Sequence, residues 1–79
     1  MRTVKINIDN IDKVKEFCEN AGKYIDNLDL VSGRYIVDAK SIMGIFSLDI
    51  SKTIELTIHG DDENAIARFL ESIDKFIIK

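Results

Sequence analysis

The sequence predicts an α+β fold: a four-stranded antiparallel sheet covered on one face by three helices, in the order β-α-β-β-α-β-α. Residues 2–8 and 53–59 alternate apolar and polar side chains, which is the pattern of strands with one buried face. Two longer segments carry apolar residues at helical spacing. The pair Ser32-Gly33, which is typical of a turn, separates two further strand-like segments. The polar face of such a sheet is free to meet water.

The first part of the chain predicts a strand and then a helix. Residues 2–8 form the strand, and residues 9–12, Asp-Asn-Ile-Asp, offer candidate caps for the helix. The helix runs to about Ala21, and Gly22 is a natural stop for it. The side of this helix that we expect to face the sheet consists of Ile11, Val14, Phe17, Cys18 and Ala21.

The middle of the chain predicts a hairpin and a short helix. Residues 24–31 and 34–39 are the strands of the hairpin, and Ser32-Gly33 is the turn between them. The run from Lys40 to Ile50 follows. Ser41 favours a helix start there, because its hydroxyl can accept a hydrogen bond from a free backbone N–H. Gly44 disfavours helix, which indicates that something else requires a residue without a side chain.

The last part predicts a strand and a final helix. Residues 53–59 form the strand, and Gly60-Asp61-Asp62 ends it and caps the helix. The apolar stripe of that helix is Ala65, Ile66, Phe69, Leu70, Ile73 and Ile77. For the whole chain, the residues that we expect to be buried are Val4, Ile6, Phe17, Leu28, Leu30, Ile54, Leu56, Ile58, Ile66, Phe69, Leu70 and Ile73.

The composition limits the functions to consider. The chain has 79 residues, which we assign to one domain, residues 1–79. Its formal charge of −3 argues against nucleic acid as a partner. One cysteine cannot form an internal disulfide, and neither a signal-peptide pattern nor a membrane-spanning run is present, so we expect a cytoplasmic protein without a membrane partner. No pattern calls for a cofactor or a metal ion.

Two motifs carry a resemblance to a known family. Residues 40–44, Lys-Ser-Ile-Met-Gly, followed by Ser47-Leu48, closely resemble the second helix of the HPr family, the small histidine-containing phosphocarriers of the sugar phosphotransferase system. Residues 55–58 and 60–65 look like the last strand of that family and its glycine–acidic lead into the final helix. The resemblance implies the family's open-faced β-sandwich. It is strongest from Val37 onward and only topological before Lys23.

The resemblance also implies a phosphate site that this chain lacks. HPr proteins carry phosphate on a histidine that caps the first helix, followed closely by an arginine and a proline. Residues 7–13 here read Asn-Ile-Asp-Asn-Ile-Asp-Lys, and the family's histidine would fall near Asn10. An amide cannot carry a phosphoryl group, and Asp9 and Asp12 would repel phosphate. We therefore expect no catalytic residue and no phosphocarrier activity.

Other chemistry-bearing residues have ordinary interpretations. His59, the only histidine, is a solvated surface residue, or else an unconventional phosphoryl acceptor at the far end from the missing site. Cys18 lies in an apolar stripe, so core packing is favoured over a nucleophile. The carboxylates of residues 61–63 favour a helix cap over a metal site, because no ligand set accompanies them.

Ser41 is either a plain helix cap or a modification site. In Gram-positive HPr and its histidine-lacking paralogue Crh, a dedicated kinase phosphorylates the serine at this place, and the product binds a catabolite-control repressor. The resemblance thus implies phosphorylation of Ser41 and two partners, a serine kinase and a transcriptional regulator. Met43 and Phe46 are one turn apart, and they either pack in the core or form an exposed docking patch. The candidate partner-binding residues are Lys40, Met43, Gly44, Phe46 and Ser47.

Asp49 stands where the family usually has glycine after Ser47-Leu48. If this position needs a left-handed conformation, aspartate adopts it less easily than glycine, and the end of the helix changes shape. From the residues and the resemblance together, the sequence predicts a non-catalytic, HPr-like and Crh-like regulatory protein of carbon catabolite control. The alternatives are a phosphocarrier with an unconventional acceptor, or a diverged HPr-fold interaction module.

Overall fold

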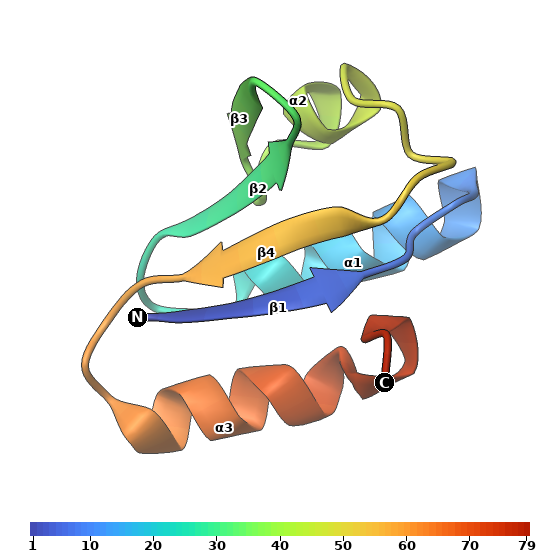
Figure 1. Cartoon of the computed structure of the whole chain (residues 1–79). Coiled ribbons are helices and arrows are strands. Elements are labelled where there is room, and N and C mark those ends of the chain that lie inside the picture. The colour runs from blue at the N-terminus through green and yellow to red at the C-terminus, as the bar shows by residue number, and fades with distance from the viewer.

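Four strands form one antiparallel sheet in the order β1-β4-β2-β3 (Figure 1). The computed structural model describes residues 1–79. The strands are β1 (Arg2–Ile6), β2 (Leu28–Ser32), β3 (Tyr35–Asp38) and β4 (Ile54–Ile58). β4 lies in the interior of the sheet, because it pairs with β1 on one side and β2 on the other. The α+β fold class and the strand order in the chain are as the sequence predicts.

Three helices lie on one face of this sheet: α1 (Ile11–Gly22), α2 (Ile42–Phe46) and α3 (Glu63–Ser72), with a 3-10 turn, η1 (Asp74–Phe76), after α3. Side chains cap the two longer helices. The Asn10 Oδ1 atom accepts a hydrogen bond from the Lys13 N–H at 2.9 Å, and Asp62 accepts from two N–H groups at the start of α3. No helix is both long enough and apolar enough to cross a lipid bilayer.

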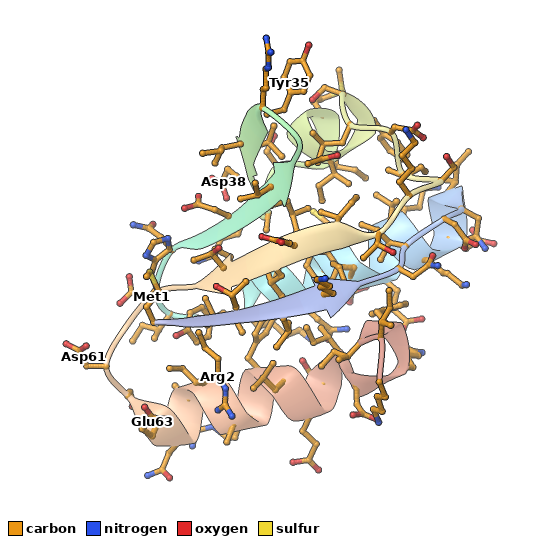
Figure 2. The ribbon with its side chains drawn as sticks, in the orientation of Figure 1. Met1, Arg2, Tyr35, Asp38, Asp61 and Glu63 are labelled. Atoms are coloured by element: carbon orange, nitrogen blue, oxygen red, sulfur yellow. The ribbon has the colours of Figure 1, made fainter.

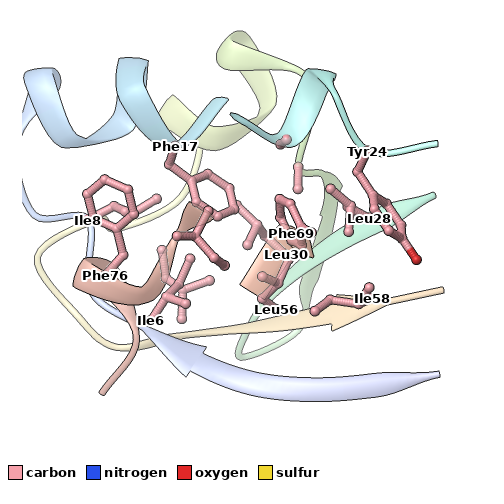
Figure 3. Packing of buried hydrophobic residues seen from close by; sticks show 14 of the residues in the cluster. Ile6, Ile8, Phe17, Tyr24, Leu28, Leu30, Leu56, Ile58, Phe69 and Phe76 are labelled. Carbon is pink, nitrogen blue, oxygen red and sulfur yellow. The ribbon is translucent and has the colours of Figure 1, made fainter. Parts of the chain in front are cut away.

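The core fills the space between the helices and the inner face of the sheet (Figure 3). On β4 the side chains of Ile54, Leu56 and Ile58 are fully buried, while Glu55 between them is exposed. All the residues expected in the core are buried except Val4 and Leu70, which are half-buried and pack against it.

The prediction that Ile11 belongs to the buried stripe of α1 is wrong. The side chain of Ile11 is 58% exposed, because it lies in the first turn of α1, beyond the end of β1 (Figure 1). Ile8, which follows β1, is fully buried. Cys18 is half-buried and packs against the core, as the interpretation of it as a packing residue requires.

Two boundaries of the predicted hairpin also differ. The second strand begins at Leu28 and not at residue 24, because the backbone first turns: the Tyr24 N–H bonds to the Ala21 carbonyl, and the Asp26 carboxylate accepts the Asn27 N–H. The hairpin turn is Gly33-Arg34, one residue later than predicted, since Ser32 still pairs with Tyr35. Gly33 has a φ of 59°, which favours glycine.

The segment after α3 departs from the predicted continuous helix. Helix α3 ends at Ser72, and Phe76 in η1 is buried edge-to-face against Phe17. The chain then turns alongside β1. The Asn7 N–H donates to the Phe76 carbonyl at 2.8 Å, and the Ile78 N–H donates to the Lys5 carbonyl at 2.9 Å. Residues 76–78 thus cover part of the outer edge of β1.

Replacing Leu56 by alanine tests the packing of the central strand. Leu56 is fully buried, so we expect Leu56→Ala to lower the free energy of unfolding by about 2–5 kcal/mol through lost burial and a residual cavity. The control is Glu55→Gln, on the open face of the same strand, which we expect to change it by less than about 0.5 kcal/mol. Urea denaturation followed by circular dichroism measures both. Equal stability of the two variants would contradict this facing of β4.

Candidate functional site

A tight turn delivers Ser41 to the start of α2. The Asp38 carbonyl accepts the Ser41 N–H at 3.0 Å, and the Asp38 carboxylate accepts the Lys40 N–H at 2.9 Å. The Ser41 Oγ atom then accepts the Gly44 N–H at 3.2 Å, so Ser41 is the N-cap that the sequence predicts. Ser41 as a whole is half-buried.

Gly44 allows α2 to pack closely on β3. A Cβ atom at this position would lie 3.3 Å from the Val37 Cβ atom, tighter than an ordinary van der Waals contact, and 3.4 Å from the Ser41 Oγ atom. The low helix propensity of glycine is therefore offset by the close approach of helix and strand. Gly44 thus lies at the contact between α2 and β3, and it is half-buried.

The two sides of α2 differ in exposure. Ile45 and Leu48 are buried in the core. Met43 is 78% exposed and Phe46 is 41% exposed. Of the two interpretations of Met43 and Phe46, the structure supports exposure, and we call this pair the docking patch. Tyr35, on the strand against which α2 packs, is also exposed and projects from the hairpin end of the sheet (Figure 2).

Two other residues of the predicted partner surface, Lys40 and Ser47, both donate side-chain hydrogen bonds to backbone carbonyls. The Lys40 ammonium reaches away from Ser41 and donates to the Tyr24 carbonyl at 2.7 Å. Ser47 is exposed at the end of α2, where its hydroxyl donates to the Gly44 carbonyl. Asp49 does not adopt a left-handed conformation, since no residue other than glycine has a positive φ. The absence of a glycine there therefore leaves the end of α2 unstrained.

The start of α1 is the place where the sequence predicts that the family's phosphate site is missing. Asn10 uses its carbonyl oxygen to cap the helix, and the Lys13 ammonium pairs with the Asp9 carboxylate at 3.0 Å. The hydrogen bond from Lys13, together with its charge, lowers the pKa of Asp9. A hollow beside this turn is lined by Asp9, Asn10, Ile11, Asp12 and Ile50. Its carboxylates disfavour phosphate, and its one nearby cation is already paired.

His59 lies at the other end of the sheet. The register pairs Arg2 with Ile58, so His59 follows the end of β4 beside the beginning of β1. Its Nε2 atom is 2.7 Å from the Asp29 carboxylate on β2, and the imidazole is 36% exposed. Sequence reasoning missed this pair, because the two residues are far apart in the chain and only the β2–β4 register brings them together.

The other candidate residues are structural. The Cys18 Sγ atom lies 3.5 Å from the Lys40 carbonyl, and burial followed by the charge of Asp38 raises the pKa of the Cys18 thiol, which lowers its reactivity. Asp62 is the N-cap of α3. No group of three or more histidine, cysteine, aspartate or glutamate side chains is placed to hold a metal ion.

Comparisons with known proteins agree with this fold. The family model described as the PTS HPr component phosphorylation site matches residues 11–77, beginning directly after Asn10. HPr-C-His from Thermoanaerobacter tengcongensis is 32% identical, with a TM-score of 0.75 over 95% of this chain and 93% of that one. The phosphocarrier protein HPr from Bacillus anthracis is 27% identical, with a TM-score of 0.69 over 90% and 92%.

A third comparison extends the likeness in fold alone. The histidine-containing phosphocarrier protein of Mycoplasma is 20% identical to this chain, with a TM-score of 0.72 over 99% of this chain and 97% of that one. A search of curated proteins found no match.

The cap at Ser41 gives a stability prediction. Ser41→Ala removes the acceptor for the Gly44 N–H and should lower the free energy of unfolding by about 0.5–2 kcal/mol. Ser41→Asn keeps a side-chain acceptor and should stay close to the wild type. Urea denaturation compares the three proteins. An alanine variant as stable as the wild type would show that the cap contributes nothing to the fold.

Proposed function

This chain belongs to the HPr family of phosphotransferase-system phosphocarriers, and we propose that it serves that system as a binding and regulatory protein that carries no phosphoryl group on histidine. HPr proteins are phosphocarriers, not catalysts, and their partners are proteins of the phosphotransferase system. The observation that carries the proposal is the contrast between two surfaces. The start of α1 has no imidazole and two carboxylates, while α2 presents a serine next to exposed apolar side chains.

Ser41 is the proposed switch of this surface. A phosphate on its hydroxyl would add about −1.5 to −2 charge and could still accept the Gly44 N–H, so the modification is compatible with the fold. In the turn before Ser41, the Lys40 ammonium already donates to the Tyr24 carbonyl, and Asp38 carries a negative charge. The added charge is therefore available to a cationic partner.

The docking patch is the proposed apolar contact for the same partner. Met43 and Phe46 are exposed on the short helix that Ser41 begins, so one partner surface can read the phosphate and cover the patch together. We propose a serine kinase of the phosphotransferase system and a transcriptional regulator of catabolite control as the two partners, acting in the cytoplasm.

The second candidate function, phosphocarrier activity on an unconventional acceptor, has less support. His59 is the one residue able to form a phosphohistidine, and its Nε2 atom faces the Asp29 carboxylate, which would repel a phosphoryl group. We expect no acid-labile, base-stable label after incubation with the first enzyme of the phosphotransferase system and labelled phosphoenolpyruvate. The control reaction uses an HPr that carries its histidine. Label that disappears in His59→Ala would contradict the proposal.

The Ser41 switch predicts site-specific phosphorylation. A serine kinase of a Gram-positive phosphotransferase system should phosphorylate the wild type and fail on Ser41→Asn, which keeps the helix cap. Mass spectrometry of the digested product locates the phosphate. The variants Ser47→Ala and Ser51→Ala should remain substrates, and phosphate found only at those two serines would exclude Ser41.

Binding of the regulator completes the same test. Phe46→Ala should weaken the affinity of the phosphorylated protein while leaving its unfolding midpoint almost unchanged. Ile78→Ala is the matched control, since Ile78 is 45% exposed and Phe46 41%, but Ile78 lies beside β1. Isothermal calorimetry measures both affinities. If Ser41 is phosphorylated but the regulator does not bind, Ser41 is a modification site without the proposed role as a switch. If the regulator binds the unphosphorylated protein, the result favours a diverged interaction module.

A further inference from the structure

A groove of about 320 Å³ lies between the end of α1 and α3, and it shares no residue with the docking patch. We propose that this groove binds a small organic anion that carries a carboxylate or phosphate group on an apolar body. Its volume is within the roughly 300–1,000 Å³ that is common for small-molecule sites. The inference does not depend on the proposed role of Ser41.

The apolar part of the groove is fixed in shape. The rings of Tyr24 and Phe69 pack against each other, with ring centroids 5.2 Å apart. The Tyr24 hydroxyl donates to the His59 carbonyl, and its backbone carbonyl accepts the Lys40 ammonium, so the ring is held from both sides. Both residues are buried, Tyr24 being 6% exposed and Phe69 5%. Ile25 stands beside them and is 85% exposed, which leaves an aliphatic side chain without a covering partner.

The charged part of the groove consists of two cations without partners. Lys23 from the end of α1 and Arg68 from α3 both line it, and neither takes part in an ion pair. Five of the eleven lysine and arginine side chains have an acceptor: Lys13, Lys40, Lys52, Lys75 and Lys79. Arg2, Lys5, Lys15 and Arg34 have none either, so Lys23 and Arg68 are distinguished by lining the groove together. The two cations in the groove can therefore form charge-assisted hydrogen bonds to a ligand without breaking any existing pair.

One carboxylate also lines the groove. Asp62 is already used, since its Oδ1 atom accepts the N–H groups of Asn64 and Ala65 at the start of α3. Its charge opposes an anionic group placed beside it, so the anionic group of a ligand would have to meet Lys23 or Arg68, and the apolar body would cover Tyr24, Phe69 and Ile25. The protein has a net charge of −3, so its overall charge does not attract an anionic ligand. Electrostatic attraction of the ligand would have to come from Lys23 and Arg68.

Titration of the ¹⁵N-labelled full chain tests the proposal by nuclear magnetic resonance. The probes are 3-phenylpropionate and phenyl phosphate, with uncharged 3-phenylpropionamide as the comparison. We expect saturable shifts of the amides of Ile25, Arg68 and Phe69 with one or both anions, and binding at least about tenfold weaker for the amide. The tighter of the two anions identifies the preferred head group. No saturation with either anion, or equal binding of the amide, would overturn the proposal.

Two pairs of variants separate the groove from general charge effects. Lys23→Gln combined with Arg68→Gln should abolish saturation, whereas Lys15→Gln combined with Arg34→Gln changes the formal charge equally at exposed sites outside the groove and should bind like the wild type. Ile25→Ser removes the exposed apolar contact without touching the core and should weaken binding severalfold. Equal loss in both charge variants, or unchanged binding in Lys23→Gln with Arg68→Gln, would show that the groove is not the site.

Discussion

The burial of β4 is the constraint on which the rest of the structure depends. This strand is the last in the chain but lies in the interior of the sheet, where β1 and β2 both pair with it. Its inner side chains, Ile54, Leu56 and Ile58, are fully buried in the core. Without it, β1 and the β2–β3 hairpin share no strand partner, so residues distant in sequence must meet before the sheet is complete.

The sheet and the core together position α2. The helix is only five residues long, too short to be stable alone, and it is held by β3 beneath it and by Ile45 and Leu48 in the core. The side that faces away from these contacts is left exposed. Met43 is exposed because the opposite side of the same short helix packs on the core through Ile45 and Leu48.

The sequence predicted the features that depend on residues close together in the chain, such as the buried side of a strand or a helix cap. The alternation in residues 53–59 identified the buried side of β4, and Ser41 and Asp62 were identified as caps because capping is a contact within one turn. The low propensity of Gly44 pointed to a close contact, but only the structure names Val37 as the neighbour.

Features set by long-range pairing could not be predicted in this way. The contact between His59 and Asp29 follows from sheet register, and the groove of Lys23 and Arg68 follows from how α1 and α3 lie together. Ile11 and Ile77 carry the right periodicity for a helical stripe, yet one lies beyond the end of the sheet and the other pairs with Ile6 as a short bridge. Periodicity describes a helix and cannot say where the neighbouring sheet ends.

The pairing of residues 76–78 with β1 has a consequence for self-association. An open antiparallel sheet has two edges, and each unpaired edge is a template on which another chain can add a strand. Here the backbone bonds at Lys5 and Asn7 occupy part of the β1 edge. The β3 edge remains, but it is only four residues long. Of the two edges of the sheet, only this short one is therefore fully open to the addition of a strand from another copy.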